Sequence, residues 1–264
     1  MLRARDFFDL SDCGFVELFS NDAPVWSALA DLKDYIAAQA GQLPGILGDG
    51  VPLSRHVALH QGTVYEGPEL EIRHGDATRG RLVACLQGRV LEGATVVMAG
   101  AVLCGRTINL GPGVLVEAGA YIREPAIIGA ASEVRQGAYL RGNCLVGRRC
   151  VVGHATEMKH SIMLDDAKAG HFAYVGDSIL GRESNLGAGT KLANLKFLRG
   201  EVRVRTPEGM VATGLSKLGA ILGDRAQTGC NSVTNPGTLI GPEGMLLPNV
   251  TAPSGWHPAR CLLR

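Results

Sequence analysis

Residues 110–169 read LGPGVL VEAGAY IREPAI IGAASE VRQGAY LRGNCL VGRRCV VGHATE MKHSIM LDDAKA, and this stretch decides the fold. Cut in sixes, it places Leu, Ile, Val or Met first in every group and a small residue fifth in most. An amphipathic helix repeats every 3.6 residues and a half-buried strand every two, so a period of six fits neither. It is typical of a triangular coil with three short strands, three corners and eighteen residues per turn. The stretch therefore predicts a left-handed parallel β-helix.

The same hexads extend in both directions from this stretch. Three groups begin at Leu91, and later runs begin at Leu180 and Ser216. Together they predict an all-β domain of about seven coils over residues 91–251, followed by a tail over 252–264. The 36 glycines and 5% aromatic residues fit tight turns and thin layers better than a packed α/β enzyme. A glycine-rich β-sandwich is the disfavoured alternative, because ten groups in one register rarely arise by chance.

The N-terminal third lacks the repeat. Residues 1–50 predict a small α/β module with one helix from about Pro24 to Ala40, where apolar residues recur at helical spacing. Residues 51–90 are β-rich but poorly periodic, and they predict a transition and capping coil, because terminal repeats of solenoids are usually atypical.

Two stretches interrupt the hexads. Residues 170–179 supply ten positions where a hexad needs six, which predicts an insertion. Residues 198–214 alternate, turn at Pro207-Glu208-Gly209 and return, which predicts a hairpin projecting from the prism. Loops carried on a rigid scaffold are frequent places for chemistry.

Composition narrows the partners. The chain has 26 basic and 25 acidic residues, so its charge does not indicate nucleic acid or a membrane surface. It lacks an apolar run of the length a membrane span needs, and its first residues lack the apolar core of a signal peptide. Seven cysteines without a C-x-x-C pair predict reduced thiols in a cytoplasmic protein. Glycine-rich nucleotide-binding motifs and a G-x-S-x-G elbow are absent from the sequence.

Three basic residues are predicted to stack. Arg123, Arg141 and Lys159 lie eighteen residues apart, each next to an inward aliphatic, so they should form one outward ladder. Neighbouring rungs in a sheet are about 4.8 Å apart. Like charges at that spacing repel unless an anion such as a phosphate neutralises them. The alternative is a solvated column balanced by Glu124 or Glu157.

His171 is the candidate general base, because histidine titrates near neutral pH. It lies in the predicted insertion, close in sequence to Lys168, Tyr174 and Asp177. A metal site made by His154, His160 and His171 is the alternative. Their spacing gives no tetrahedral arrangement, so no metal is predicted.

Four segments carry a resemblance to a known family. They are Gly153–Lys159 (GHATEMK), Lys168–Asp177 (KAGHFAYVGD), Asn185–Thr190 (NLGAGT) and Lys217–Asp224 (KLGAILGD). The first three resemble the acetyltransferase half of the bifunctional N-acetylglucosamine-1-phosphate uridyltransferase/glucosamine-1-phosphate acetyltransferases. The fourth, with the hairpin before it, looks like the archaeal-type sugar-1-phosphate nucleotidylyltransferase/acetyltransferases. The similarity covers roughly residues 111–250.

The resemblance implies an acetyl-CoA-dependent N-acetyltransferase acting on an amino-sugar 1-phosphate, such as glucosamine- or galactosamine-1-phosphate. His171 would then be the catalytic base. The residues that it implies for the substrate are Arg141, Lys159, Tyr174, Asn185 and Asn194. Ala188 and Cys230 would border acetyl-CoA. Such sites lie between the subunits of a homotrimer.

The sequence departs from the family pattern in several places. The uridyltransferase domain is absent, Cys230 stands where serine is usual, and the chain after Pro253 is short. Two alternative functions therefore stay open. One is an acetyltransferase for a nucleotide-linked amino sugar, whose extra phosphates would meet Arg199, Arg203 and Arg205. The other is a non-catalytic trimeric subunit that binds a sugar nucleotide or a separate nucleotidyltransferase.

Overall fold

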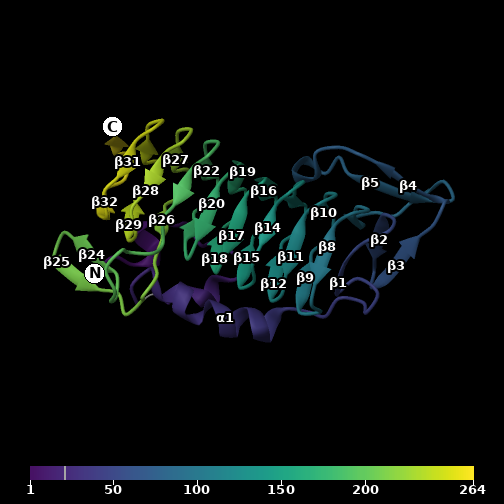
Figure 1. Ribbon diagram of the computed structural model, residues 1–264, viewed down its shortest axis with the longest axis horizontal. Coiled ribbons are helices and arrows are strands. Elements are labelled where there is room, and N and C mark those ends of the chain that lie inside the picture. Colours follow the sequence, from purple (N-terminus) through teal and green to yellow (C-terminus); the bar gives the residue numbers. More distant parts are fainter. Residues whose placement is uncertain (21) are drawn as a thin grey trace.

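The computed structural model describes residues 1–20 and 22–264, and most of this chain forms a triangular prism of short strands (Figure 1). The predicted left-handed parallel β-helix is confirmed, but it has about nine turns instead of the predicted seven. Each turn contributes one strand to each of three faces, in the order B, A, C, and successive turns pair in parallel. The faces are defined below by their strands.

Face A contains β8 (Val102–Cys104), β11 (Tyr121–Arg123), β14 (Tyr139–Leu140), β17 (Glu157–Lys159), β20 (Tyr174–Gly176), β23 (Lys191–Leu192), β28 (Val233–Thr234) and β31 (Thr251–Ala252). Face B contains β7 (Thr95–Val97), β10 (Leu115–Val116), β13 (Glu133–Val134), β16 (Val151–His154), β19 (Lys168–His171), β22 (Asn185–Leu186), β27 (Gln227–Thr228), β30 (Met245–Leu246) and β33 (Leu262–Leu263). Face C contains β9 (Ile108–Leu110), β12 (Ala126–Ile128), β15 (Cys144–Val146), β18 (Ser161–Met163), β21 (Ile179–Leu180), β26 (Ala220–Leu222), β29 (Thr238–Ile240) and β32 (Gly255–His257).

The inward aliphatics of the hexads fill the prism. On face A the side chains of Ile122, Leu140, Met158, Val175 and Leu192 stack in one column, each 0% exposed. Burying such side chains stabilises the fold by about 1.5–3 kcal/mol each before chain entropy is counted. The first residue of each hexad therefore points into the prism, as predicted, up to Met158.

The predicted hexad register is wrong beyond Met158. The corners at His160 and Asp177 each contain one residue fewer than a hexad allows. Leu140 and Val146 are six residues apart, and Gly142 and Asn143 turn the corner between them with positive φ angles of 90° and 50°. One coil later, His160 alone turns that corner, with φ 46°. Strand pairing consequently shifts from 18 to 17 residues per coil.

The predicted insertion at residues 170–179 is likewise wrong. These residues complete β19, form β20 and begin β21, and all three strands pair in parallel with the coils on either side. The coil has one residue fewer than eighteen rather than several more. His171 therefore lies at the end of a strand and not in a loop.

The N-terminal segment covers face C instead of forming a separate α/β module. Helix α1 (Ser27–Gln39) runs along the prism beside β15 and β18 (Figure 1). One apolar cluster joins buried residues of this segment to outward side chains of face C: Phe7, Trp26, Leu29, Leu32 and Ile36 with Leu145, Ile162, Ile179, Ile221 and Leu239. This packing buries the aliphatic side chains of helix α1.

The first coil is capped by antiparallel strands over residues 49–90. Strand β1 (Asp49–Pro52) pairs with β8, and the hairpin β2 (Val57–His60)–β3 (Thr63–Glu66) pairs with β7. The strands β4 (Leu70–Arg73), β5 (Val83–Leu86) and β6 (Arg89–Val90) form a small sheet beyond them (Figure 1). Short 3₁₀ turns occur at Ala4–Asp6, Val16–Leu18 and Ala77–Arg79.

At the other end, the predicted tail is part of the prism, because β32 and β33 continue the parallel ladders to Leu263. The hairpin β24 (Arg203–Thr206)–β25 (Gly209–Ala212) leaves the prism between faces A and C, as predicted (Figure 1). Its buried Val202 and Val204 join the cluster on face C. No helix in the described residues is long and apolar enough to cross a membrane.

Candidate active site

The corner between faces B and A, called the BA corner below, stacks four of the residues singled out in the sequence. His154 and His171 are register partners in β16 and β19. The pairing of β19, β22 and β27 carries the same column onward to Ala188 and Cys230, and the Asn231 N–H donates to the Ala188 carbonyl at 2.8 Å. The structure thus brings the predicted base and both predicted cofactor-binding positions into one line.

The imidazole of His171 is open to solvent at this corner. Its strand ends there because the next residue, Phe172, takes a left-handed conformation with φ 53°. The Phe172 ring is 56% exposed, and it lies 6.4 Å from the His171 ring and 5.1 Å from the His154 ring between centroids. An exposed imidazole beside an exposed aromatic ring can accept a proton from a ligand without any opening of the fold.

A shallow groove of about 450 Å³ runs along face A next to the BA corner. Its lining residues are Ala155, Glu157, Phe172, Ala173, Tyr174, Lys191, Ala193, Asn194 and Leu195. Two predicted substrate-binding residues, Tyr174 and Asn194, therefore share one groove. Tyr174 follows His171 by three residues in the chain, and Asn194 lies in the next coil.

Tyr174 lies across its own strand toward Asn194. Its hydroxyl donates to Asn194 Oδ1 at 3.3 Å, and burial raises the pKa of Tyr174. Gly176 makes this possible: a Cβ there would come within 2.6 Å of the Tyr174 hydroxyl and 2.8 Å of Asn194 Nδ2. The missing Cβ of Gly176 therefore leaves the space for this contact, and its backbone φ is not in the left-handed region.

Asp177 joins this pair to the basic ladder. Its Oδ2 accepts hydrogen bonds from Asn194 Nδ2 and, at 3.2 Å, from Lys159 Nζ. Its Oδ1 lies 2.9 Å from His160 Nδ1. Burial alone raises the pKa of this carboxyl, but the bonds from His160, Asn194 and Lys159 outweigh that effect and hold the pKa below its usual value.

Two of the three residues in the basic ladder are paired with carboxylates from the chain itself. The register of β11, β14 and β17 places Arg123, Arg141 and Lys159 in one column. Arg141 donates to Glu157 at 2.6 Å, and Lys159 donates to Asp177. The Arg141–Glu157 pair matches the alternative of a column balanced by Glu157, and the partner of Lys159 is Asp177.

Asn185 is separated from the other substrate-binding candidates. It lies on face B, paired with Lys168, and lines a second groove of about 460 Å³ with Asp166, Lys168, Glu183 and Ser184. The predicted site residues therefore occupy both sides of the BA corner, and the fold of this chain does not bring all of them to a single cavity.

Three residues next to the site, His160, Asp177 and Glu157, were not predicted as substrate-binding or catalytic residues. The available signal was spacing: His160, Asp177 and Asn194 are separated by 17 residues each, which is the true coil length here. The assumed period of 18 concealed this column. The alternative metal site does not form, because His160 turns the corner opposite His154 and His171, and the described residues offer no group of three metal ligands.

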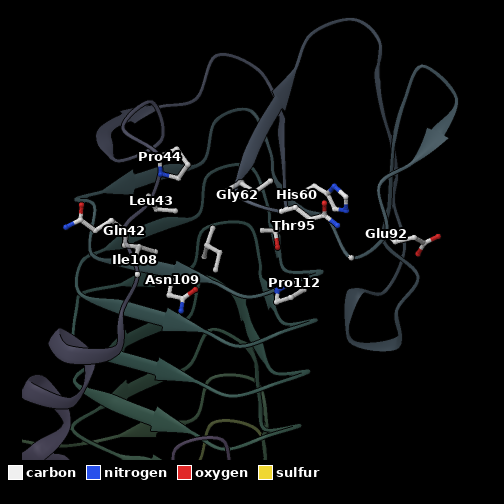
Figure 2. A pocket seen from close by; sticks show the side chains of 15 residues that line it. Gln42, Leu43, Pro44, His60, Gly62, Glu92, Thr95, Ile108, Asn109 and Pro112 are labelled. Carbon is white, nitrogen blue, oxygen red and sulfur yellow. The ribbon is translucent and has the colours of Figure 1, made fainter.

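A further cleft of about 450 Å³ lies at the capped end of the prism, well away from the BA corner. Figure 2 shows Gln42, Pro44 and Asn109 on one side of it and His60 and Thr95 on the other. None of the predicted site residues lines it.

Comparisons with known proteins agree with the sequence motifs. The model of the GMPPB C-terminal domain matches residues 122–235, a range that contains both sides of the BA corner. The chain is 36% identical over 133 residues to a bifunctional sugar-1-phosphate nucleotidylyltransferase/acetyltransferase of Sulfurisphaera tokodaii, covering 50% of this chain and 33% of that protein. It is 38% identical over 109 residues to the bifunctional protein GlmU of Methanococcus maripaludis, covering 41% and 26%.

These matches confirm the predicted resemblance to the hexapeptide-repeat half of the bifunctional sugar-1-phosphate nucleotidylyltransferase/acetyltransferases. The chain spans a third or less of the length of these two relatives. Among solved structures, Arabidopsis UDP-N-acetylglucosamine acyltransferase matches with a TM-score of 0.25 and 13% identity, over 58% of this chain and 64% of that one.

Proposed function

We propose that the chain is an acetyltransferase that moves the acetyl group of acetyl-CoA to the amine of an amino-sugar 1-phosphate, as a step in nucleotide-sugar biosynthesis in the cytoplasm. The observation that carries the proposal is the BA corner. There the register stacks His171 on Ala188 and Cys230, and the groove with Tyr174 and Asn194 begins beside it.

His171 acts as the general base in this proposal. Its imidazole accepts a proton from the substrate amine while the nitrogen attacks the thioester carbonyl. The backbone N–H of Ala188 is the candidate donor to the tetrahedral oxyanion. When the intermediate collapses, the C–S bond breaks and the imidazolium returns the proton to the CoA thiolate, so the histidine is regenerated.

The phosphate binds at the basic ladder. A phosphate offers several acceptor oxygens to Arg141 and Lys159, whereas each now meets a single carboxylate. The Tyr174–Asn194 pair lies on the same face as the ladder, in the groove that begins beside His171, so it is available to the sugar hydroxyls.

A homotrimer completes the site. Asn185 lies on face B while Tyr174 lies on face A, so a neighbouring subunit is needed to bring a face B residue to a face A groove. Apolar side chains beside the groove are available for that contact: Phe172, Leu195, Phe197 and Leu198 are 56%, 64%, 109% and 81% exposed.

A nucleotide-linked amino sugar is the second candidate substrate. Arg123 continues the ladder one coil beyond Arg141, and Arg203 and Arg205 are exposed on the hairpin. These groups offer positive charge to a second phosphate, although the hairpin lies on the face C side of the prism.

A thiol-release assay with acetyl-CoA tests the proposal. The panel contains glucosamine-1-phosphate, galactosamine-1-phosphate, their UDP conjugates and unphosphorylated glucosamine. We expect the highest kcat/KM with a sugar 1-phosphate. A higher kcat/KM for a UDP conjugate favours the second candidate. Absence of turnover across the panel, with a folded trimer by light scattering, contradicts both and favours the non-catalytic alternative.

A further inference from the structure

Asp177 is the most heavily engaged buried carboxylate on face A. Its residue is only 4% exposed, and its carboxylate receives hydrogen bonds from three different side chains. Two of these donors, Lys159 and Asn194, are predicted to contact the substrate. The third, His160, comes from the same corner one coil earlier.

The backbone fixes where this carboxylate points. Asp177 turns the corner between faces A and C in the left-handed region, with φ 45°. Its N–H donates to the Lys159 carbonyl at 3.0 Å, and its carbonyl accepts from the Gly219 N–H at 2.8 Å. A side chain on a backbone tied at both ends has little freedom to follow a moving ligand.

The two carboxylate oxygens have different partners. His160 holds Oδ1, which leaves Oδ2 to Lys159 and Asn194. Asn194 uses its amide nitrogen for this bond, so its Oδ1 is the acceptor for the Tyr174 hydroxyl. The orientation of the amide, and with it that of the tyrosine, therefore depends on a negatively charged acceptor at residue 177.

We propose that Asp177 is the positioning residue of the sugar-phosphate subsite, and that His160 is its anchor. This inference rests on the proposed function for the identity of the ligand. Asp177 does not touch the reacting atoms: it aligns Lys159 and Asn194, and through Asn194 it aligns Tyr174. When a phosphate takes Lys159, Asp177 keeps its other two partners, so the groove remains formed while the ligand exchanges.

Asp177→Asn is the direct test, because the amide keeps the shape but loses the charge and one acceptor. Hydrogen bonds to charged groups are the stronger kind, so we expect KM for the amino-sugar phosphate to rise about tenfold to hundredfold. KM for acetyl-CoA should stay within about twofold, since the BA corner column is untouched. An unchanged KM for the sugar phosphate would overturn the proposal.

Asp224→Asn is the matched control. Asp224 is similarly buried at 6% exposure, but it accepts backbone N–H groups of Asp9 and Arg182 and holds the N-terminal segment. The control should leave KM for both substrates unchanged. If it raises the sugar-phosphate KM as much as Asp177→Asn does, the effect is a general loss of stability and the positioning role is wrong.

Variants at His160 test the anchor separately. His160→Asn retains a nitrogen donor near the position of Nδ1, whereas His160→Leu removes it. We expect the sugar-phosphate KM to rise several-fold in His160→Leu and to be rescued in His160→Asn. Equal KM values for the two variants would overturn the anchoring role.

A crystal structure of Asp177→Asn distinguishes this proposal from the proposed function. We expect the Asn194 amide and the Tyr174 ring to leave their wild-type positions, whatever the enzyme's substrate is. Should wild type fail to acetylate any amino sugar, the proposed function fails alone and the side-chain positions still decide the positioning role. Unchanged positions of Asn194, Tyr174 and Lys159 would refute it.

Discussion

Faces A and C are built from the same repeat, but the chain itself covers face C and leaves face A open. Every strand of face C from β12 to β29 turns an apolar side chain outward, and helix α1 and the N-terminal segment cover this column. Face A turns Tyr139, Glu157, Tyr174 and Lys191 outward, with Arg141 and Lys159 beside them, and none of these is fully buried. The outward residues, rather than the repeat, decide whether a face binds its own chain or remains open to a ligand.

The burial patterns of single strands show the same contrast. In β15 of face C, Cys144, Leu145 and Val146 are all buried, whereas in β17 of face A only Met158 is. Face C therefore contributes to stability on both sides of its sheet. Face A contributes on one side, and its other side can tolerate charges that a packed face would exclude.

Ile162→Ala should produce the largest change in stability. Ile162 is 0% exposed between β18 and the N-terminal segment, and truncating such a residue costs about 2–5 kcal/mol. Its counterpart on face A is Lys191→Ala, which should change the free energy of unfolding by less than about 0.5 kcal/mol. Urea denaturation measures both; similar losses would contradict the division between covered and open faces.

Gly176→Ala should damage the open face without unfolding the protein. The new methyl group would meet the Tyr174 hydroxyl and Asn194 Nδ2, which are ends of side chains and can move. We expect KM for the sugar phosphate to rise about tenfold, which corresponds to about 1.4 kcal/mol, while the midpoint of thermal unfolding stays nearly constant. A wild-type KM in this variant would show that the Tyr174–Asn194 contact has no part in binding.

The sequence was sufficient to predict the β-helix but only part of the site. The inward aliphatics repeat so regularly that the prism follows from them, and the same argument stacked Arg123, Arg141 and Lys159. A corner with one left-handed residue instead of two cannot be predicted from hydrophobicity. Histidine is a residue type that is enriched at positive φ, but this preference does not say how many residues the corner at His160 contains. The residue missing from each of the corners at His160 and Asp177 hid the column of His160, Asp177 and Asn194.

The covering of face C was also beyond the pattern of hexads. Its outward positions are apolar residues next to inward apolar residues, so they look like an uninterrupted core. The helix over residues 27–39 was predictable from its spacing, but its place along face C depends on packing between distant segments.

The pH dependence of stability should separate Asp177 from Asp224. Burial opposes ionisation of Asp177, yet hydrogen bonds from His160 and Asn194 and the charge of Lys159 lower its pKa. Its contribution to stability is thus present above 3.8, the ordinary value, and lost as pH falls through the lowered pKa. Burial raises the pKa of Asp224, so its contribution is present at acidic pH and lost as pH rises through the raised pKa.

We therefore expect Asp177→Asn to lose more stability at pH 7 than at pH 3, and Asp224→Asn to lose more at pH 3 than at pH 7. Urea denaturation at both pH values measures the difference relative to wild type. If both variants lose more stability at the same pH, the opposite pKa shifts of Asp177 and Asp224 are contradicted.

Arg148→Ala should have only a small effect on stability. Arg148 joins Asp165 of the prism to Asp12 of the N-terminal segment at 2.6 and 2.8 Å, but it is 39% exposed. Ion pairs at such positions contribute about 0–1 kcal/mol, so the N-terminal segment should stay docked through its apolar contacts. A much larger loss in urea denaturation would indicate that charge, rather than apolar packing, holds face C covered.

The most direct test of the open BA corner as an acetyl-transfer site compares two histidines of one column. His171→Ala should lower kcat for acetyl transfer to a sugar 1-phosphate by about 10²–10⁴-fold while CoA still binds. His154→Ala, one coil away and paired in register with His171, should change kcat by less than about threefold. A wild-type kcat in His171→Ala, or equal losses in the two variants, would contradict the account.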